Sequence, residues 1–149
     1  MATWREIEED APEFARRVRS RFDAGTNKTI ATLRADGAPR ISAIELKFEG
    51  GEVTFGMMAG SRKLADVSRD PRIAVHCPTI EPPEDPATWE GDAKLTGAAV
   101  ETSPVGDPDG RAFRCDITEA VLTYVGTPAD HLVIESWQPG RGWQRQTRK

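Results

Sequence analysis

Three polar residues in the middle of the chain, Ser61, Arg62 and Lys63, have the types and spacing of an anion site. Ser61 is a good helix N-cap, and Leu64 and Val67 follow at helical spacing, so we expect a helix to begin there. The first turn of a helix presents free amide N–H groups and the positive end of the helix dipole. Arginine adds a bidentate fork and lysine a point charge, and together they suit a phosphate.

Both cations oppose the dipole at the start of this helix, so they weaken the isolated helix. Residues that cost local stability often serve a ligand. The sequence therefore predicts a phosphate clamp at residues 61–63. The alternative interpretation is two solvated cations on a surface turn.

A strand must lead into the clamp. Val53 and Phe55 alternate with Thr54, which indicates a strand, and Gly56 and Gly60 bracket the turn that follows. The helix itself is expected over residues 61–68. A strand, a glycine-containing turn and a helix N-terminus direct amide groups at one spot, as an anion requires.

Apolar periodicity predicts one amphipathic helix over residues 4–22, followed by short strands. Tight turns at Asp36-Gly37 and at residues 49–52 make the first three strands an antiparallel meander. Ile41 lies out of phase with the apolar residues after it, so a bulge that changes the face is expected within residues 39–48. The expected strands cover residues 28–34, 39–48, 53–55, 72–77, 93–101, 119–126, 132–137 and 143–148.

Two segments are expected to be loops. Residues 78–92 are rich in proline and acid and carry Trp89, which either covers a ligand or joins a small satellite cluster. Residues 103–116 are expected to form a loop with one short helix around residues 111–115. The many short strands and two convincing helices indicate an antiparallel barrel.

Length and composition point to one domain over residues 1–149. The net charge of −4 argues against bulk nucleic-acid binding. No apolar run approaches the roughly 20 residues of a membrane span, and the N-terminus has no signal-peptide core, so a cytoplasmic location is expected. Cys77 and Cys115 are expected to be free buried thiols, and the scattered histidines and carboxylates predict no metal site.

Motifs of self-sufficient catalysis are missing. The chain has no nucleophile elbow, no Walker A sequence and no Gly-x-Gly-x-x-Gly after a strand. The sequence therefore assigns no catalytic residue. It predicts a protein that borrows its chemistry from a cofactor and uses its own residues to hold that cofactor.

Four segments resemble motifs of the pyridoxamine 5'-phosphate oxidase-like, FMN-binding split-barrel superfamily. Residues 39–44 resemble the strand that lies along the flavin, and residues 60–63 match the Gly-Ser-Arg-Lys turn that holds the FMN phosphate. Residues 70–75 resemble the turn into the next strand, and residues 134–140 resemble the late Trp-Gln motif. Their order and spacing make this likeness stronger than any one motif.

The resemblance implies a mainly β, antiparallel split barrel of six to seven strands, of Greek-key type, with an N-terminal helix and a short helix after the third strand. It also implies a flavin-dependent oxidoreductase that binds FMN, acts on a small, planar molecule, and forms a homodimer with the cofactor site at the subunit interface. The residues that match cofactor-binding positions are Arg40, Ile41, Ser42, Ala43, Ile44, Gly56, Met57, Ser61, Arg62, Lys63 and Trp137.

The sequence departs from the oxidase at its substrate positions. Glu45 stands where the oxidase has a lysine, Gly56-Met57 replaces a Tyr-Thr pair, and the late Arg-x-His that grips the substrate phosphate is missing. We therefore expect negligible pyridoxamine-phosphate oxidation. Two alternatives follow: a reductase that uses the deazaflavin coenzyme F-420, and a non-catalytic flavin or haem carrier or sensor.

An apolar cover suits a flat, weakly charged substrate. The side chains that could form it are also suited to the core or to a dimer interface. They are Met57, Met58, Trp89 and Trp143.

Overall fold

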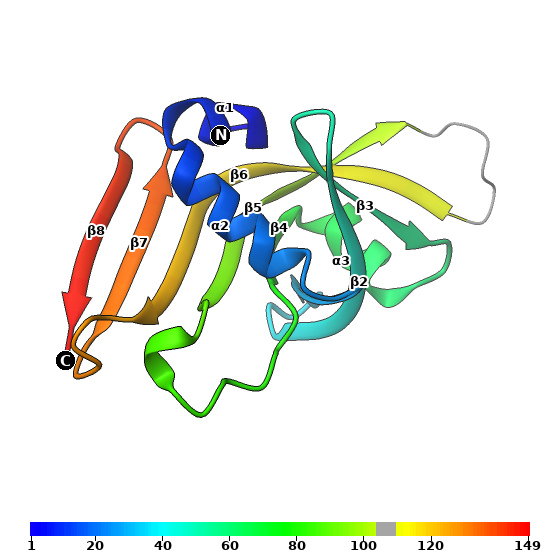
Figure 1. The fold of residues 1–149 in the computed structure, drawn as a ribbon. Helices are drawn as coiled ribbons and strands as arrows, with labels where there is room; N and C mark the ends of the chain where they lie inside the picture. The colour runs from blue at the N-terminus through cyan, green and yellow to red at the C-terminus, as the bar shows by residue number, and fades with distance from the viewer. Residues whose placement is uncertain (104–109) are drawn as a thin grey trace.

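The computed structural model describes residues 1–103 and 110–149. Figure 1 shows an eight-stranded antiparallel sheet with helices packed on it. The elements are α1 (Trp4–Asp10), α2 (Pro12–Phe22), β1 (Asn27–Leu33), β2 (Pro39–Glu49), β3 (Glu52–Met58), α3 (Arg62–Arg69), β4 (Arg72–His76), the 3-10 helix η1 (Pro86–Thr88), β5 (Asp92–Ser103), β6 (Gly110–Val125), β7 (Leu132–Gln138) and β8 (Gly142–Arg148).

Six of the strands close into a barrel. The sheet order is β3-β2-β1-β4-β5-β6-β7-β8, and a second pairing of β3 with β6 closes the ring from β1 to β6. The last two strands, β7 and β8, extend the sheet from β6 and lie to one side of the barrel (Figure 1). The predicted mainly β split barrel is confirmed, with these two strands added to the ring.

The N-terminal segment forms two helices, so the single helix expected over residues 4–22 was wrong. Thr3 and Glu6 form a capping box at the start of α1. Ala11 separates the helices with φ −141° and ψ 69°, and Pro12 opens α2. Proline has no N–H for the helix ladder and disfavours a helical residue before it, which explains the break.

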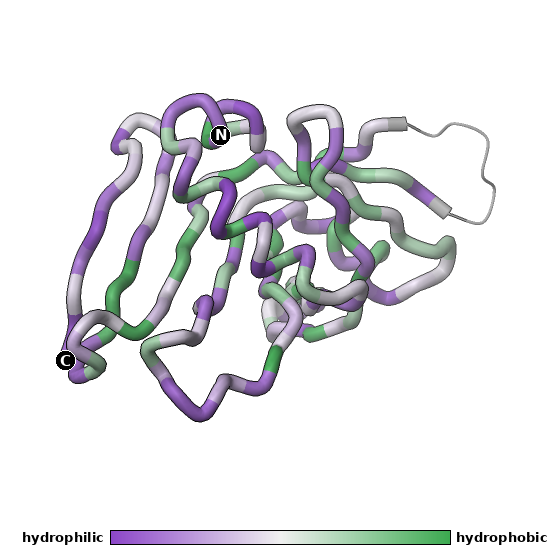
Figure 2. Tube along the Cα trace, in the orientation of Figure 1, coloured by the Kyte–Doolittle hydropathy of each residue, from purple (hydrophilic) through white to green (hydrophobic). Residues whose placement is uncertain are grey.

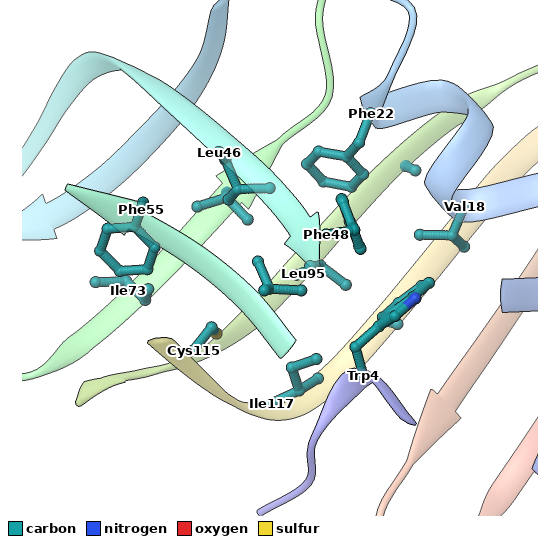
Figure 3. Close-up of a cluster of buried hydrophobic side chains, with 14 of the residues drawn as sticks. Trp4, Val18, Phe22, Leu46, Phe48, Phe55, Ile73, Leu95, Cys115 and Ile117 are labelled. Atoms are coloured by element: carbon teal, nitrogen blue, oxygen red, sulfur yellow. The ribbon is translucent and has the colours of Figure 1, made fainter. Parts of the chain in front are cut away.

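The hydrophobic core lies between these helices and the inner face of the barrel. Figure 3 shows Trp4, Val18 and Phe22 from the helices pointing toward Phe48 and Leu95 on the strands. The rings of Trp4 and Phe48 meet edge to face, with centroids 4.7 Å apart. Figure 2 shows green, apolar stretches along strands of the barrel and along β7, whereas β8 at the edge of the sheet is mostly purple.

β2 alternates regularly, so the bulge and change of face expected within residues 39–48 were wrong. Ile44, Leu46 and Phe48 are buried, and the β1–β2 ladder shows no register shift. Ile41 points outward and is 75% exposed. The apolar residue out of phase is therefore a surface residue of a regular strand, and it needs its own explanation.

The short helix expected around residues 111–115 was also wrong, because this segment is the first half of β6. It pairs with β3 on one side and β5 on the other, so two ladders override a weak local helical signal. The loop expected before it includes residues 104–109, which lie outside the described residues. Among the helices that the structure describes, none is long and apolar enough to cross a membrane.

Candidate functional site

The barrel splits where β2 and β3 part. These two strands pair only from Glu49↔Glu52 to Leu46↔Phe55. Beyond that pair β3 continues along β6, with which its opposite edge already pairs from Thr54 on, while β2 continues along β1. Within residues 1–103 and 110–149, no strand pairs with the other edge of residues 39–45. We call this point the fork.

The free edge of β2 carries the backbone groups of alternate residues. Arg34 N–H donates to Ala38 O at 2.8 Å, which makes that pair the hydrogen-bonded one of the hairpin. Counting along the antiparallel register, the groups of Ile41 and Ala43 then point away from β1. Lys63 agrees with this count, because its Nζ donates to Ala43 O at 2.7 Å. The free edge thus offers hydrogen-bonding backbone beside the start of α3.

The predicted start of α3 is confirmed. Ser61 is the N-cap, and its hydroxyl accepts from Leu64 N–H at 3.3 Å. Arg62 is exposed, and within the described part of the chain its guanidinium has no ion-pair or hydrogen-bond partner. Lys63 is half-buried and bridges to β2. Arg62, the anchored Lys63 and the first-turn amides therefore gather at the fork.

A buried carboxylate holds α3 against β1 and β2. Asp66 is 2% exposed and accepts from Arg40 Nε and Thr32 Oγ1, each at 2.7 Å. Arg69 donates to its other oxygen at 3.0 Å. The bond from Arg40, followed by that from Thr32, keeps the pKa of the Asp66 carboxyl below its usual value despite burial. Arg40, a predicted cofactor contact, thus positions the helix that carries the clamp.

The remaining predicted residues divide by face. Ile44 and Met57 point into the core and are at most 4% exposed, so only their backbones are available to a ligand. Gly56 lies on the outer face of β3 and is exposed, and Ser42 is half-buried on β2. Met58 is 74% exposed on β3, close to the turn into α3.

Trp137 lies away from the fork. It is on β7, in the sheet extension on the other side of the molecule from α3 in Figure 1. Its ring is buried, and its indole N–H donates to Asp10 Oδ2 at 2.7 Å. Within one chain the structure therefore does not bring Trp137 to the other predicted site residues.

The outer face next to the free edge carries several small side chains. Ala43 lies opposite Thr29, and Ile41 lies opposite Ala31, which lies opposite Ala74 on β4. Residues directly opposite each other in an antiparallel sheet share a face. This face therefore lets a planar group approach the backbone closely, and the exposed Ile41 offers it an apolar contact.

A groove of about 490 Å³ opens at the fork. It shares Gly56 with the predicted site and reaches the end of the free edge at Glu45. In the sequence, the alternating charges of Glu45, Lys47 and Glu49 were the signal that could have pointed to this groove. The groove itself becomes visible only when the pairing of β2 with β3 is known. We call it the fork groove, and its lining is Glu45, Lys47, Glu49, Thr54, Phe55, Gly56, Thr102, Ala112 and Phe113.

The described residues also bring His76, Cys77 and Asp92 together, with ligand atoms within 4.8 Å of one another. The Cys77 sulfur accepts from Ala93 N–H, and burial raises the pKa of its thiol. Burial likewise raises the pKa of the Cys115 thiol, to about 12. Both cysteines are free and buried, as the sequence predicted.

No known protein family matches the chain, and no curated protein is similar to it in sequence. Solved structures do match its fold. PhzG from Burkholderia lata 383, in complex with tetrahydrophenazine-1-carboxylic acid, has a TM-score of 0.66 at 12% identity, over 97% of this chain and 92% of that one. A pyridoxamine 5'-phosphate oxidase-related, FMN-binding protein from Nostoc punctiforme PCC 73102 has a TM-score of 0.64 at 9% identity, over 100% and 98%.

An F420 reductase also matches, with a TM-score of 0.51 at 17% identity, over 67% of this chain and 92% of that one. The chain has the pyridoxamine 5'-phosphate oxidase-like split-barrel fold. At these identities the likeness describes the fold, so the function of this split barrel must be argued from its own residues.

Proposed function

We propose that this split barrel is an oxidoreductase that binds FMN or a deazaflavin coenzyme at the fork. The observation that carries the proposal is the start of α3, where Arg62 has no partner among the described residues, beside the edge of β2 that no described strand pairs with. A phosphate and a planar ring need these two surfaces next to each other. The fold shared with an FMN-binding protein and an F420 reductase supports it.

The residues divide the work of holding such a cofactor. Arg62, Lys63 and the first-turn amides are suited to the phosphate. The backbone groups of Ile41 and Ala43 are suited to the polar edge of the ring. A bound flavin or deazaflavin would supply the electron transfer, and the chain would bind it, orient it and exclude water. Asp66 and Arg40 keep α3 in place for this role.

We further propose a homodimer with the site at the subunit interface. Ile41 and Met58 expose large apolar side chains near the fork, at 75% and 74%, and a partner subunit would cover them. Trp137 would reach a cofactor only through such a partner. Analytical ultracentrifugation at micromolar concentration should give a dimer, and an obligate interface of this kind should bury about 2,000 Å² or more in total. A monomer would contradict the proposal.

The absorption spectrum of the purified protein, followed by titration with FMN and with the deazaflavin coenzyme, tests cofactor binding directly. Steady-state reduction of enones, quinones and tetrapyrroles by each reduced cofactor then tests turnover. Reduction of any acceptor class supports an oxidoreductase. Tight binding without turnover would favour a carrier or sensor, and no binding of either cofactor would overturn the proposal.

We expect negligible oxidation of pyridoxamine phosphate. Its phosphate needs cations besides those that hold the cofactor, and the fork groove presents the carboxylates of Glu45 and Glu49 instead. An oxygen-dependent assay for pyridoxal phosphate measures this. Efficient product formation would restore the activity of the parent oxidase.

A further inference from the structure

We propose that the fork groove binds the positively charged part of a planar aromatic substrate. This inference rests on the proposed function, because it places the substrate next to the edge where the cofactor would lie. It names a substrate class: flat, cationic ring systems, and rings that carry an amine. The argument comes from the position, the shape and the charge of the groove.

The groove begins where the β2–β3 ladder stops. Leu46↔Phe55 is the last pair, so Glu45 and Gly56 would face each other next, but the strands part there. Glu45 is two residues from Ala43, whose carbonyl accepts from Lys63. On the other strand, Met58 O accepts from Ser61 N–H at 3.1 Å. A ligand in the groove would therefore lie next to the proposed cofactor site, which β2 and β3 both approach.

The floor of the groove is formed by the small residues Gly56 and Ala112, which leave space above the backbone. Gly56 lies opposite Ala112, and a Cβ built at Gly56 would meet only Arg111 O, at 3.7 Å. Beneath them the rings of Phe55 and Phe113 stack, with centroids 5.7 Å apart and planes 11° from parallel. A volume of about 490 Å³ falls within the usual range for small-molecule sites. The groove therefore suits a flat ring.

The β2 wall of the groove is acidic. Glu45 and Glu49 point outward with Lys47 between them. In the described part of the chain the Glu45 carboxylate has no hydrogen-bond or ion-pair partner, and Glu49 accepts only from Thr54 Oγ1, at 3.3 Å. Glu52 lies directly opposite Glu49, and like charges in this arrangement destabilise a sheet.

On β6 the groove is lined by Ala112 and Phe113, and the arginines next to them in the sequence are already paired, Arg111 with Glu101 and Arg114 with Asp116. Among the described residues that line the groove, Lys47 is the one cation beside the carboxylates of Glu45 and Glu49, so the field in the groove favours a positive ligand. Hydrated surface charges interact weakly, so the selectivity comes from several carboxylates acting together.

Two planar dyes of similar size test the inference. Methylene blue is a cation and resorufin is an anion at neutral pH. The binding of each to the full-length protein is followed by absorbance or fluorescence, with and without FMN, at low and high salt. We expect methylene blue to bind roughly tenfold more tightly than resorufin, with a preference that falls as salt is added.

Charge-neutral variants of the groove then locate the binding. Glu45→Gln and Glu49→Gln should each weaken methylene blue binding about two- to fivefold, and Lys47→Gln should strengthen it by a similar factor. The matched control is Glu84→Gln in the exposed loop between β4 and β5, which should change nothing. Circular dichroism confirms that each variant folds.

The outcomes are distinguishable. Equal affinity for the two dyes, or methylene blue binding that ignores Glu45 and Glu49 or responds equally to Glu84, would overturn this inference. FMN affinity is measured in the same samples, and its absence in the native protein would overturn the proposed function instead. Weaker methylene blue binding by Glu45→Gln and Glu49→Gln, together with stronger binding by Lys47→Gln, would support the inference.

Discussion

The fork and the sheet extension of β7 and β8 differ in how they treat polar groups. In the extension, Glu135 is buried and accepts from Arg17, Tyr124 and Trp143. The indole N–H of Trp137 likewise donates a hydrogen bond to Asp10. At the fork, the side chains of Arg62 and Glu45 have no such partners among the described residues, and no described strand pairs with the edge of β2 on which Ala43 O accepts from Lys63.

This difference separates two uses of polarity. A paired and buried polar group fixes one arrangement of the chain, since leaving it unpaired is costly. An exposed and unpaired group at a strand edge or a helix start costs little in water, and it remains available to a ligand. Changes at the fork should therefore affect binding, and changes in the extension should affect stability.

The largest expected effect is at the clamp. The double substitution Arg62→Ala and Lys63→Ala should weaken FMN and deazaflavin binding by roughly 2–4 kcal/mol, because charge-assisted bonds are each worth about 1.5–3 kcal/mol and do not simply add. The urea midpoint should stay nearly constant. Fluorescence titration measures the affinity. The matched control, Arg145→Ala with Arg148→Ala, removes two exposed cations from β8, and unchanged affinity in the clamp variant would remove the clamp hypothesis.

The reverse effect is expected in the extension. Glu135→Ala leaves the Tyr124 hydroxyl and the Trp143 indole without their acceptor and removes the partner of Arg17. It should lower the free energy of unfolding by about 2–3 kcal/mol, as judged by urea denaturation. Glu13→Ala, which breaks an exposed pair with Arg16, should have no measurable effect. Equal losses in the two variants would contradict the contrast.

Asp66 connects the two behaviours, because it is a buried and paired group that positions the fork. Asp66→Asn should cost about 1–2 kcal/mol of stability at pH 7, since Arg40 and Arg69 lose a charged acceptor. The folded-state pKa of Asp66 lies below its usual 3.8. The extra stability of the native protein over Asp66→Asn should therefore be fully present above pH 3.8. It should disappear as the pH falls through the lowered pKa of the folded state. Urea unfolding at several pH values measures this, and an advantage that persists in strong acid would refute it.

The smallest effect should come from Trp137→Phe, which keeps a ring in the core and removes the bond to Asp10. Stability should fall by about 1 kcal/mol, with FMN affinity unchanged. Thermal unfolding and FMN titration report the two quantities separately. A clear loss of FMN affinity would instead show that Trp137 meets the cofactor of a second subunit.

The sequence by itself determined the local features of this protein. Alternation of apolar residues located most strands, Asp36-Gly37 marked a hairpin, and Ser61 marked the start of α3. These signals depend on residues near one another in the chain, and so they can be read from it. The break at Pro12 was also readable, but the helical period across residues 4–22 concealed it.

Only the tertiary structure decided where β2 stops pairing with β3. The barrel closes through β6, a segment far along the chain, which pairs with the opposite edge of β3 from Thr54 to Met58 and holds this strand where it parts from β2. The parting of the two strands leaves the edge at Ile41 and Ala43 free, places Lys63 on that edge, and opens the groove at Glu45. Strand partners are selected by long-range packing and closure of the barrel, which no local pattern encodes.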